Sequence, residues 1–291
     1  MNNLAVLLNT QGRSEEAESL YRQSLAIKKK VLGEDHPSYL SSLNNMARVL
    51  EAQGKLSQAE AMLRQALKEK LRVLKEDHPA TLIAMDNLAS ILAHEDKSDE
   101  AEALFRDVMA RRQRVLGPDD RDTLQSMNNL AHLLALREKY DQAEPLYRQT
   151  IDLRQRVLGE TNYYTVNSKG GLAQMYEMQR RWNDAELVLV DLCKPQTLAA
   201  QTPVIAANII ARYGVCLAEE KKFAEAEPSL LDAKRRLRDA GQPGSARMRD
   251  VLQSLANVYD STARPDQAAK ERAELSALTA ASAPATKPAG Q

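Results

Sequence analysis

The chain has 291 residues, and its 40 lysines and arginines balance its 40 aspartates and glutamates. Without net charge the protein has no general electrostatic attraction to nucleic acid or to an anionic membrane, so we expect neither as a partner. Aromatic residues are only 4% of the chain, and the abundant Ala, Leu, Glu, Gln, Arg and Lys favour helix over sheet.

From its first residues the chain repeats itself with a step of 42 residues. A fixed period of this size predicts a solenoid, in which each unit buries its apolar face only by stacking on its neighbours. An Asn-apolar-Ala triplet stands at Asn3-Leu4-Ala5, Asn45-Met46-Ala47, Asn87-Leu88-Ala89 and Asn129-Leu130-Ala131. An Ala-Glu pair begins at Ala17, Ala59, Ala101, Ala143, Ala185 and, one residue early, Ala226.

The second unit shows what one repeat contains. Apolar residues recur at three- and four-residue spacing from Leu40 to Leu50, which predicts a first helix. Gly54 interrupts this pattern, and the same spacing resumes from Leu56 to Leu67, which predicts a second helix. Each repeat is therefore expected to consist of helix A, a tight turn and helix B.

Short motifs mark the expected helix starts. In Asp35-His36-Pro37 and Asp77-His78-Pro79, a capping residue precedes a proline whose fixed φ suits the first helical position. Ser57, followed three residues later by Glu60, matches a capping box that opens helix B. Helix B carries acids early and bases late, as in Lys28 and Arg112, which complements the helix dipole.

Later units depart from this pattern. We expect Gly170-Gly171, in place of the Asn-Asn pair, to weaken a helix A, and the following helix B to end early near Lys194-Pro195. Residues 279–291 lack periodicity and are expected to form a disordered tail. Met1 falls partway along the first helix A, so we expect a mis-set start codon or a missing upstream part. Seven helix pairs are predicted, at about 1–35, 36–77, 78–119, 120–161, 162–196, 197–241 and 245–278.

The segments KLSQAE and KYDQAE, followed by LYRQ and VLGEDHP, resemble the tetratricopeptide repeat, and the 42-residue variant is similar to that of kinesin light chains. The resemblance covers about residues 1–278. It implies an all-α fold, an α-solenoid of about seven antiparallel helix-turn-helix repeats whose A helices line a concave groove. It also implies small residues, such as Ala47, where helices A and B touch.

In this family the asparagine before the apolar-Ala pair of helix A points into the groove. A side-chain amide both donates and accepts hydrogen bonds, so it can hold the backbone of an extended peptide. Arg48 would favour an acidic ligand group, and His132 could be a pH-sensitive contact. Alternatively, the asparagines satisfy neighbouring helix ends and His132 is an ordinary polar residue. The predicted peptide-binding residues are Asn3, Asn45, Arg48, Asn87, Asn129 and His132.

The sequence contains no glycine-rich phosphate loop, metal-ligand spacing or nucleophile elbow, so we predict neither an enzyme nor a cofactor. No stretch has the roughly 20 apolar residues of a membrane span, and Cys193 and Cys216 are too few for a disulfide framework. We predict a soluble, cytoplasmic scaffold that binds a protein or peptide ligand.

Two alternatives stay open. Similar arrays occur at the C-terminal end of bacterial serine/threonine kinases, so the resemblance also allows a recruiting part of a larger signalling protein. An apolar face exposed on the first repeat would instead allow self-association with a second copy.

Overall fold

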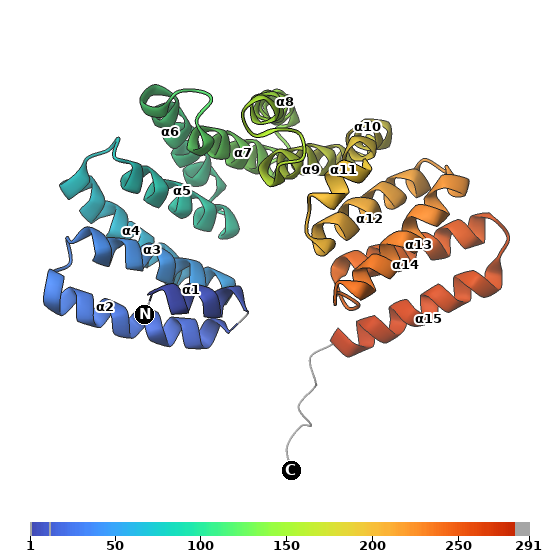
Figure 1. Cartoon of the computed structure of the whole chain (residues 1–291), viewed down its shortest axis with the longest axis horizontal. Helices are drawn as coiled ribbons and strands as arrows, with labels where there is room; N and C mark the ends of the chain where they lie inside the picture. Colours follow the sequence, from blue (N-terminus) through green and yellow to red (C-terminus); the bar gives the residue numbers. More distant parts are fainter. Residues whose placement is uncertain (1, 12, 283–291) are drawn as a thin grey trace, which may run out of the picture. The chain divides into compact units, whose positions relative to one another are not determined.

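The computed structural model describes residues 2–11 and 13–282, and all regular structure in them is helical (Figure 1). This part of the chain has fifteen helices and no strand, which confirms the predicted all-α repeat fold. The helices are α1 (Asn2–Thr10), α2 (Ser14–Leu32), α3 (Pro37–Ala52), α4 (Leu56–Leu74), α5 (Pro79–His94), α6 (Ser98–Leu116), α7 (Arg121–Leu136), α8 (Tyr140–Leu158), α9 (Tyr163–Met178), α10 (Trp182–Leu192), α11 (Pro195–Ala199), α12 (Pro203–Glu219), α13 (Phe223–Asp239), α14 (Ala246–Ser261) and α15 (Pro265–Ser282).

The chain divides into two compact units, Met1–Leu146 (unit 1) and Tyr147–Gln291 (unit 2), and the division falls within α8. In unit 1 each helix from α1 to α7 packs against the next, and α3 also contacts α1 and α5. The A helices α1, α3 and α5 therefore form one row, paired with the B helices α2, α4 and α6 (Figure 1). Ala47, Ala89 and Ala131, at most 1% exposed, permit this close packing.

The A helices begin at side-chain caps that recur every 42 residues. His36 Nδ1 accepts a hydrogen bond from the backbone N–H of Ser38 at 3.1 Å, and His78 does the same for Ala80. Asp120 caps α7 and Asn162 caps α9 through the same contact, two residues on. In the Asp-His-Pro motifs the histidine itself is therefore the cap, and each cap contributes about 1 kcal/mol to helix stability.

The predicted capping box at Ser57 is wrong. Helix α4 begins one residue earlier, at Leu56, and its N-cap makes no side-chain hydrogen bond. Ser57 Oγ instead donates to Glu95 at 3.0 Å, and Glu60 pairs with Lys97 of the next repeat at 2.8 Å. Glu60, which the capping box would have bonded to a backbone N–H, binds Lys97 instead, because an ion pair is stronger than a hydrogen bond to a neutral N–H.

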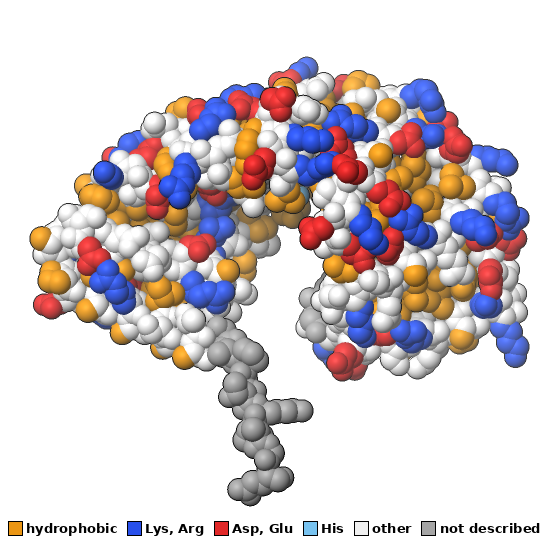
Figure 2. All heavy atoms as spheres, turned by 180° about the vertical axis from the view of Figure 1, so that it is seen from behind, with side chains coloured by type: hydrophobic (Ala, Val, Ile, Leu, Met, Phe, Trp, Pro, Cys, Tyr) orange, Lys and Arg blue, Asp and Glu red, His pale blue; other side chains and the backbone are white. Residues whose placement is uncertain are grey.

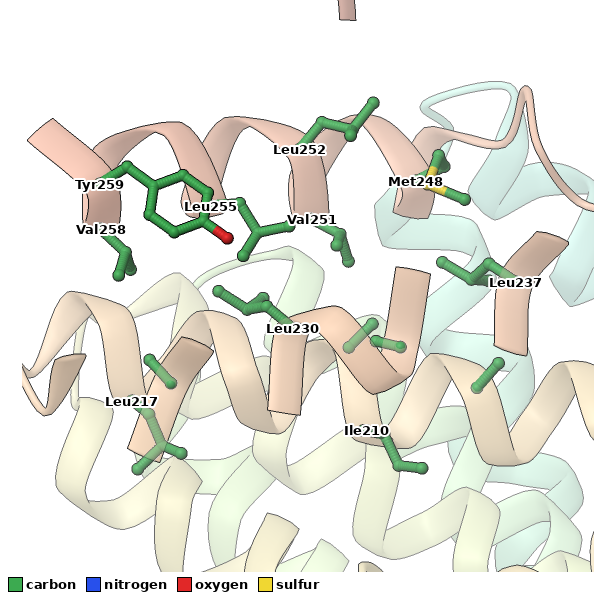
Figure 3. Packing of buried hydrophobic residues seen from close by; sticks show 14 of the residues in the cluster. Ile210, Leu217, Leu230, Leu237, Met248, Val251, Leu252, Leu255, Val258 and Tyr259 are labelled. Atoms are coloured by element: carbon green, nitrogen blue, oxygen red, sulfur yellow. The ribbon is translucent and has the colours of Figure 1, made fainter. Parts of the chain in front are cut away.

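In unit 2, α12 to α15 enclose a continuous apolar core (Figure 3). Leu230 and Leu237 of α13 face Val251 and Leu255 of α14, and all four are at most 1% exposed. Gly214 of α12 lets α13 approach, since a Cβ at this position would lie 2.9 Å from the Leu230 side chain. Each buried leucine contributes roughly 2 kcal/mol through lost apolar surface.

The helix that contains Gly170-Gly171 forms in full as α9. A Cβ on Gly171 would lie 2.8 Å from the Tyr147 ring, so the glycine makes room for this buried side chain. The contact explains why a residue of low helix propensity occupies the position.

Two regions of unit 2 differ in length from the regular repeat. Helix α10 has 11 residues, whereas α4 and α6 have 19, and the short helix α11 follows it. Helix α15 continues to Ser282, so residues 279–282, the first four of the expected tail, are helical. Alanine in this stretch favours helix. The rest of the expected tail, 283–291, lies outside the described residues.

Candidate functional site

A buried or half-buried base recurs every 42 residues in the B helices and ties each one to the next A helix. In α4, Lys70 Nζ donates to the carbonyl oxygen of Ala80 at 3.1 Å. The same bond, to the carbonyl ten residues on, joins Lys28 to Ser38 at 3.2 Å, Arg112 to Asp122 at 3.1 Å and, in unit 2, Arg154 to Tyr164 at 2.8 Å. These late bases therefore do more than complement the helix dipole.

Three of these four bases also donate to a serine fourteen residues on. The distances are 2.7 Å from Lys28 to Ser42, 2.6 Å from Arg112 to Ser126 and 2.7 Å from Arg154 to Ser168.

Lys70 differs from the other three, because Ala84 occupies the position of that serine. Arg112 also forms an ion pair with Asp86 at 3.1 Å, but the residue equivalent to Asp86 in the previous repeat is Asn44. Within the described part of the chain, the Ala80 carbonyl is the one acceptor bound by Lys70 Nζ. Lys70 is 2% exposed, and burial lowers its pKa to about 8.

Lys70 lies in the wall of a pocket of about 290 Å³ between α3, α4 and α5. Asn44 is 6% exposed, and its Oδ1 has no hydrogen-bond partner among the described residues. An unpaired buried amide oxygen is costly. Asn44 lacks a partner for this oxygen, and Lys70 lacks the ion pair that Arg112 has in the next repeat. The pocket is lined by Ser41, Asn44, Asn45, Arg48, Lys70, Ala80, Ile83 and Asn87.

Three predicted binding residues meet in this pocket: Asn45 and Arg48 of α3, and Asn87 of α5. Asn45 and Asn87 are half-buried, whereas Arg48 is exposed. Asn45 also forms a hydrogen bond with the hydroxyl of Tyr21, a buried residue that the sequence did not single out. Burial raises the pKa of Tyr21, and Arg48 and this hydrogen bond partly offset the rise.

Asn129 and His132 do not line this pocket. Asn129 accepts a hydrogen bond from Gln125 at 2.7 Å and donates to Asp86 at 3.4 Å, so its amide is engaged within unit 1. His132 has an exposed ring, yet surrounding protein atoms reduce its hydration and lower its pKa, and His94 adds to this effect. The side chain of Asn3 lies outside the described residues.

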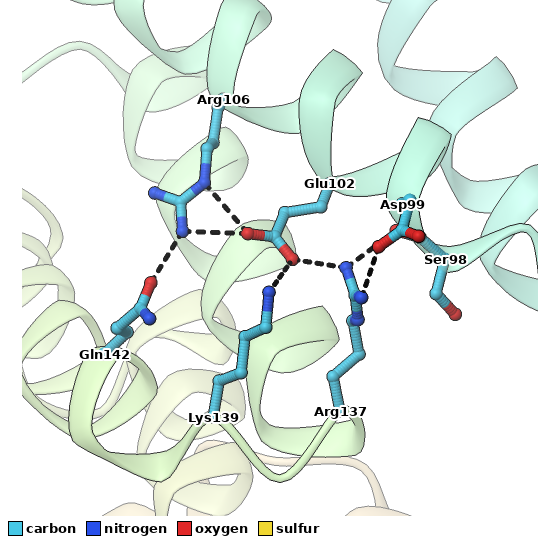
Figure 4. Close-up of polar contacts among 7 residues, drawn as sticks. All are labelled: Ser98, Asp99, Glu102, Arg106, Arg137, Lys139 and Gln142. Carbon is cyan, nitrogen blue, oxygen red and sulfur yellow. Dashed lines mark hydrogen bonds and ion pairs between the residues drawn. The ribbon is translucent and has the colours of Figure 1, made fainter.

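Glutamates of the Ala-Glu pairs link successive repeats. Glu18 pairs with Lys55 at 2.9 Å, and Glu102 with Lys139 at 2.8 Å, each linking one B helix to the start of the next. Glu102 also binds Arg106 and Arg137 (Figure 4). Hydrogen bonds from Lys55 and then Arg22 lower the pKa of Glu18 to about 2. These carboxylates hold repeats together and are not poised as general acids or bases.

Acidic and basic side chains alternate on the face shown in Figure 2, with no extended field of one sign. Within residues 2–11 and 13–282, no cluster of three or more His, Cys, Asp or Glu could hold a metal ion. No helix in that part is both long and apolar enough to cross a membrane.

Comparison with known families gives a direct match. A model of the tetratricopeptide repeat matches residues 1–68, 80–156 and 122–191, and a second such model matches residues 44–113. No curated protein sequence matches the chain.

Solved structures of similar fold include nearly identical TPR-like repeats from a candidate kinesin light chain of Podosopora anserina. This structure is 26% identical, covers 67% of this chain and 94% of its own, and has a TM-score of 0.59. BtubC (BKLC) from P. vanneervenii is 18% identical, covers 78% and 92%, and has a TM-score of 0.68. The apo quorum sensor NprR from B. thuringiensis is 12% identical, covers 96% and 87%, and has a TM-score of 0.61. The last two share the fold alone.

Proposed function

Because the chain belongs to the tetratricopeptide repeat family, with repeats similar to those of kinesin light chains, we propose that it is a protein-interaction scaffold without catalysis of its own. Its ligand is an extended segment of a peptide or partner protein that lies across the A helices of unit 1. The observation that carries this proposal is that Asn45, Arg48 and Asn87 line one pocket.

The spacing of the two asparagines supports an extended ligand. Asn45 and Asn87 occupy equivalent positions on α3 and α5, which are in contact. Packed helices lie about 8–10 Å apart and an extended chain rises about 3.3 Å per residue, so the two amides would meet every third residue of a bound segment. Arg48 lies one helical turn after Asn45 and adds a positive charge at the same surface.

The surroundings of the pocket favour binding over chemistry. The carboxylates at the repeat junctions are held in ion pairs, such as Glu60 with Lys97 and Glu18 with Lys55. Burial raises the pKa of the Cys193 and Cys216 thiols to about 12, so neither is an activated nucleophile. Both thiols are free, as is usual in the reducing cytoplasm, which is the compartment we propose.

The test is selection of peptides from a display library on the wild-type protein, followed by affinity measurements on variants. Asn45→Ala with Asn87→Ala should weaken the selected peptides by at least about tenfold, since each loses backbone hydrogen bonds. The control is Gln58→Ala with Gln65→Ala, which removes two amides from the exposed face of α4 in the same region. Thermal melting of the control should be nearly unchanged, and the asparagine variant should melt at a slightly lower temperature with its cooperative transition intact, because Tyr21 loses its hydrogen bond to Asn45.

Unchanged affinity in the asparagine variant, with weakening in the control, would place the ligand on the B helices and overturn the proposal. Loss of the melting transition in the asparagine variant would instead show that Asn45 and Asn87 are structural residues.

Self-association is a second candidate function, favoured by apolar side chains on α1 and α2. Leu4, Leu7, Ile27 and Val31 are each more than half exposed. A second copy could cover them, because burying apolar surface is favourable. Sedimentation across a range of concentrations tests this, with Ile27→Lys and Val31→Lys expected to shift the protein toward monomer. A wild-type monomer at high concentration would exclude it.

A further inference from the structure

We propose that unit 2 has a second docking site, a pocket on its B helices that takes a tyrosine side chain of a partner protein. The pocket has a volume of about 450 Å³ and lies between α8, α9 and α10. Seven of its nine lining residues belong to the B helices α8 and α10, and none is among the residues predicted to bind peptide. The site therefore goes beyond the function proposed above, which concerns the A helices of unit 1.

The pocket contains a charged residue at a position where earlier repeats are apolar. In unit 1, Met85 packs against Leu82 and Val108 in a small buried cluster. Lys169 occupies the position of Met85 two repeats later, and it is only 8% exposed. Its ammonium forms an ion pair with Asp191 of α10. A buried ion pair has a desolvation cost that a methionine does not have, so the stability of the stack alone does not account for the lysine.

The pair of Lys169 and Asp191 offers both a donor and an acceptor to a neutral ligand. An ammonium has three N–H donors, and among the acceptors that the structure describes Asp191 is the one that Lys169 Nζ binds. Asp191 also binds Lys194, yet a carboxylate has about four acceptor sites. A phenol hydroxyl donates and accepts at once, whereas an indole N–H only donates and a phenyl ring does neither. The pair therefore favours tyrosine over tryptophan and phenylalanine.

The charges that line the pocket also favour an uncharged ligand. The two bases, Arg148 and Lys169, are balanced by two acids, Asp152 and Asp191. A charged ligand group would bring an unpaired charge into this balanced set and would lose its own hydration. A phenol, which is neutral at pH 7, has neither cost.

Apolar surface lines the pocket and continues beyond it. Ile151 and Val188 form walls on which an aromatic ring can pack, and Leu187 of the same pocket is 69% exposed. Val190, outside the pocket, is 46% exposed, and Leu231 at the equivalent position of α13 is 43% exposed. In the four preceding B helices this position is an arginine, namely Arg22, Arg64, Arg106 and Arg148. A small phenol would leave Val190 and Leu231 in water, whereas a partner protein anchored by its tyrosine can cover them.

The first measurement is a titration of the full chain, labelled at its isoleucine, leucine and valine methyl groups and followed by NMR. The probes are N-acetyltyrosinamide and, as its matched control without the hydroxyl, N-acetylphenylalaninamide. The tyrosine probe should shift the methyl resonances of Ile151 and Val188. It should also bind at least about fivefold more tightly than the control, because its hydroxyl meets Lys169 and Asp191.

Lys169→Met tests the polar pair, because methionine is the residue at this position in two earlier repeats. Asp191 keeps Lys194 as a partner, so the variant should fold. It should bind the two probes within about twofold of each other, since the ammonium is gone. Lys270→Met makes the same change at an exposed position of α15 and should keep the preference for tyrosine.

A display library of peptides with a fixed central tyrosine tests whether the occupant is a partner protein. The bait is Asn45→Ala with Asn87→Ala, which depletes ligands of the A-helix groove, and the affinities of selected peptides are then measured on the wild type. Val190→Arg introduces the arginine of the earlier repeats, where it pairs with the glutamate four residues before it, so the fold should accept it. This variant should weaken the selected peptides by at least about fivefold and leave N-acetyltyrosinamide unaffected, because Val190 lies outside the pocket.

Equal affinity of the two probes for the wild type would overturn the proposal, as would Ile151 and Val188 resonances that neither probe moves. Selected peptides that bind Val190→Arg as tightly as the wild type would overturn the assignment to a partner protein. These outcomes do not depend on the A-helix groove, because the bait lacks its two asparagines and the probes report on unit 2.

Discussion

Lys70 and Arg112 hold the same place in consecutive repeats of unit 1, yet the fold surrounds them differently. Each donates to the carbonyl ten residues on, which fixes its B helix to the next A helix. Around Arg112 the fold adds Asp86 at 3.1 Å, while Lys70 meets Asn44 and Ala84 in the equivalent places. One repeat thus satisfies its buried charge internally, and the other leaves it facing a pocket. The two repeats therefore share the structural bond and differ in whether the buried base has a counter-ion.

The largest expected effect comes from removing the two charges in turn. Arg112→Met should lower the free energy of unfolding by about 4 kcal/mol, because it leaves Asp86 buried without its cation. Lys70→Met should be neutral or stabilising, because it removes an uncompensated charge. Chemical denaturation of both variants measures the difference. Equal losses would show that the two bases have the same structural role.

The next largest effect is on the pH dependence of stability, which should differ between the wild type and Lys70→Met. The pKa of Lys70 is about 8 in the folded protein and 10.5 without burial, so the unfolded chain binds more protons between these values. Stability of the wild type relative to Lys70→Met should therefore rise by about 3 kcal/mol as pH increases from 8 to 10.5. Denaturation of both proteins across this range isolates the lysine from other titrating groups. A flat difference would mean that Lys70 is hydrated.

A smaller gain is expected when the second repeat is made to match the third. Asn44→Asp should raise the free energy of unfolding at pH 7 by about 1.5 kcal/mol, because the new carboxylate pairs with the buried Lys70. The gain is modest, because burying the carboxylate has a desolvation cost of its own. The variant should also show a smaller increase in the free energy of unfolding between pH 8 and 10.5 than the wild type. Denaturation in parallel with Gln58→Glu, which adds an exposed charge, separates pairing from net charge. Destabilisation would show that the pocket cannot hold an anion.

The smallest effect concerns the side-chain caps of the A helices α5 and α7. His78→Ala should cost about 1 kcal/mol, because the N–H of Ala80 loses its acceptor. His78→Asp should retain stability, since Asp120 caps α7 through the same bond at 2.8 Å. Thermal melting of the two variants checks this. Equal losses would show that the imidazole contributes packing rather than a cap.

The sequence predicted the fold correctly because stacked repeats are periodic, and a 42-residue step over many units admits few other architectures. It also pointed to Asn45, Arg48 and Asn87, through the family pattern of helix A, although their role in binding stays a prediction. It did not point to Lys70 or Asn44. Lys70 is one of several basic residues late in helix B, and nothing in its own segment sets it apart. Comparing equivalent positions in consecutive repeats would have shown that Asn44 and Ala84 replace Asp86 and Ser126.

By itself, then, the sequence determined the helices, their order and the positions that face their neighbours, because propensity, capping and apolar spacing act over a few residues. Only the tertiary structure decided which polar groups are satisfied. Whether Lys70 meets a hydroxyl, a carboxylate or an open pocket depends on residues of α3 and α5 brought beside α4 by packing. Buried electrostatics depends on three-dimensional neighbours, and the neighbours of Lys70 lie ten or more residues away in the chain.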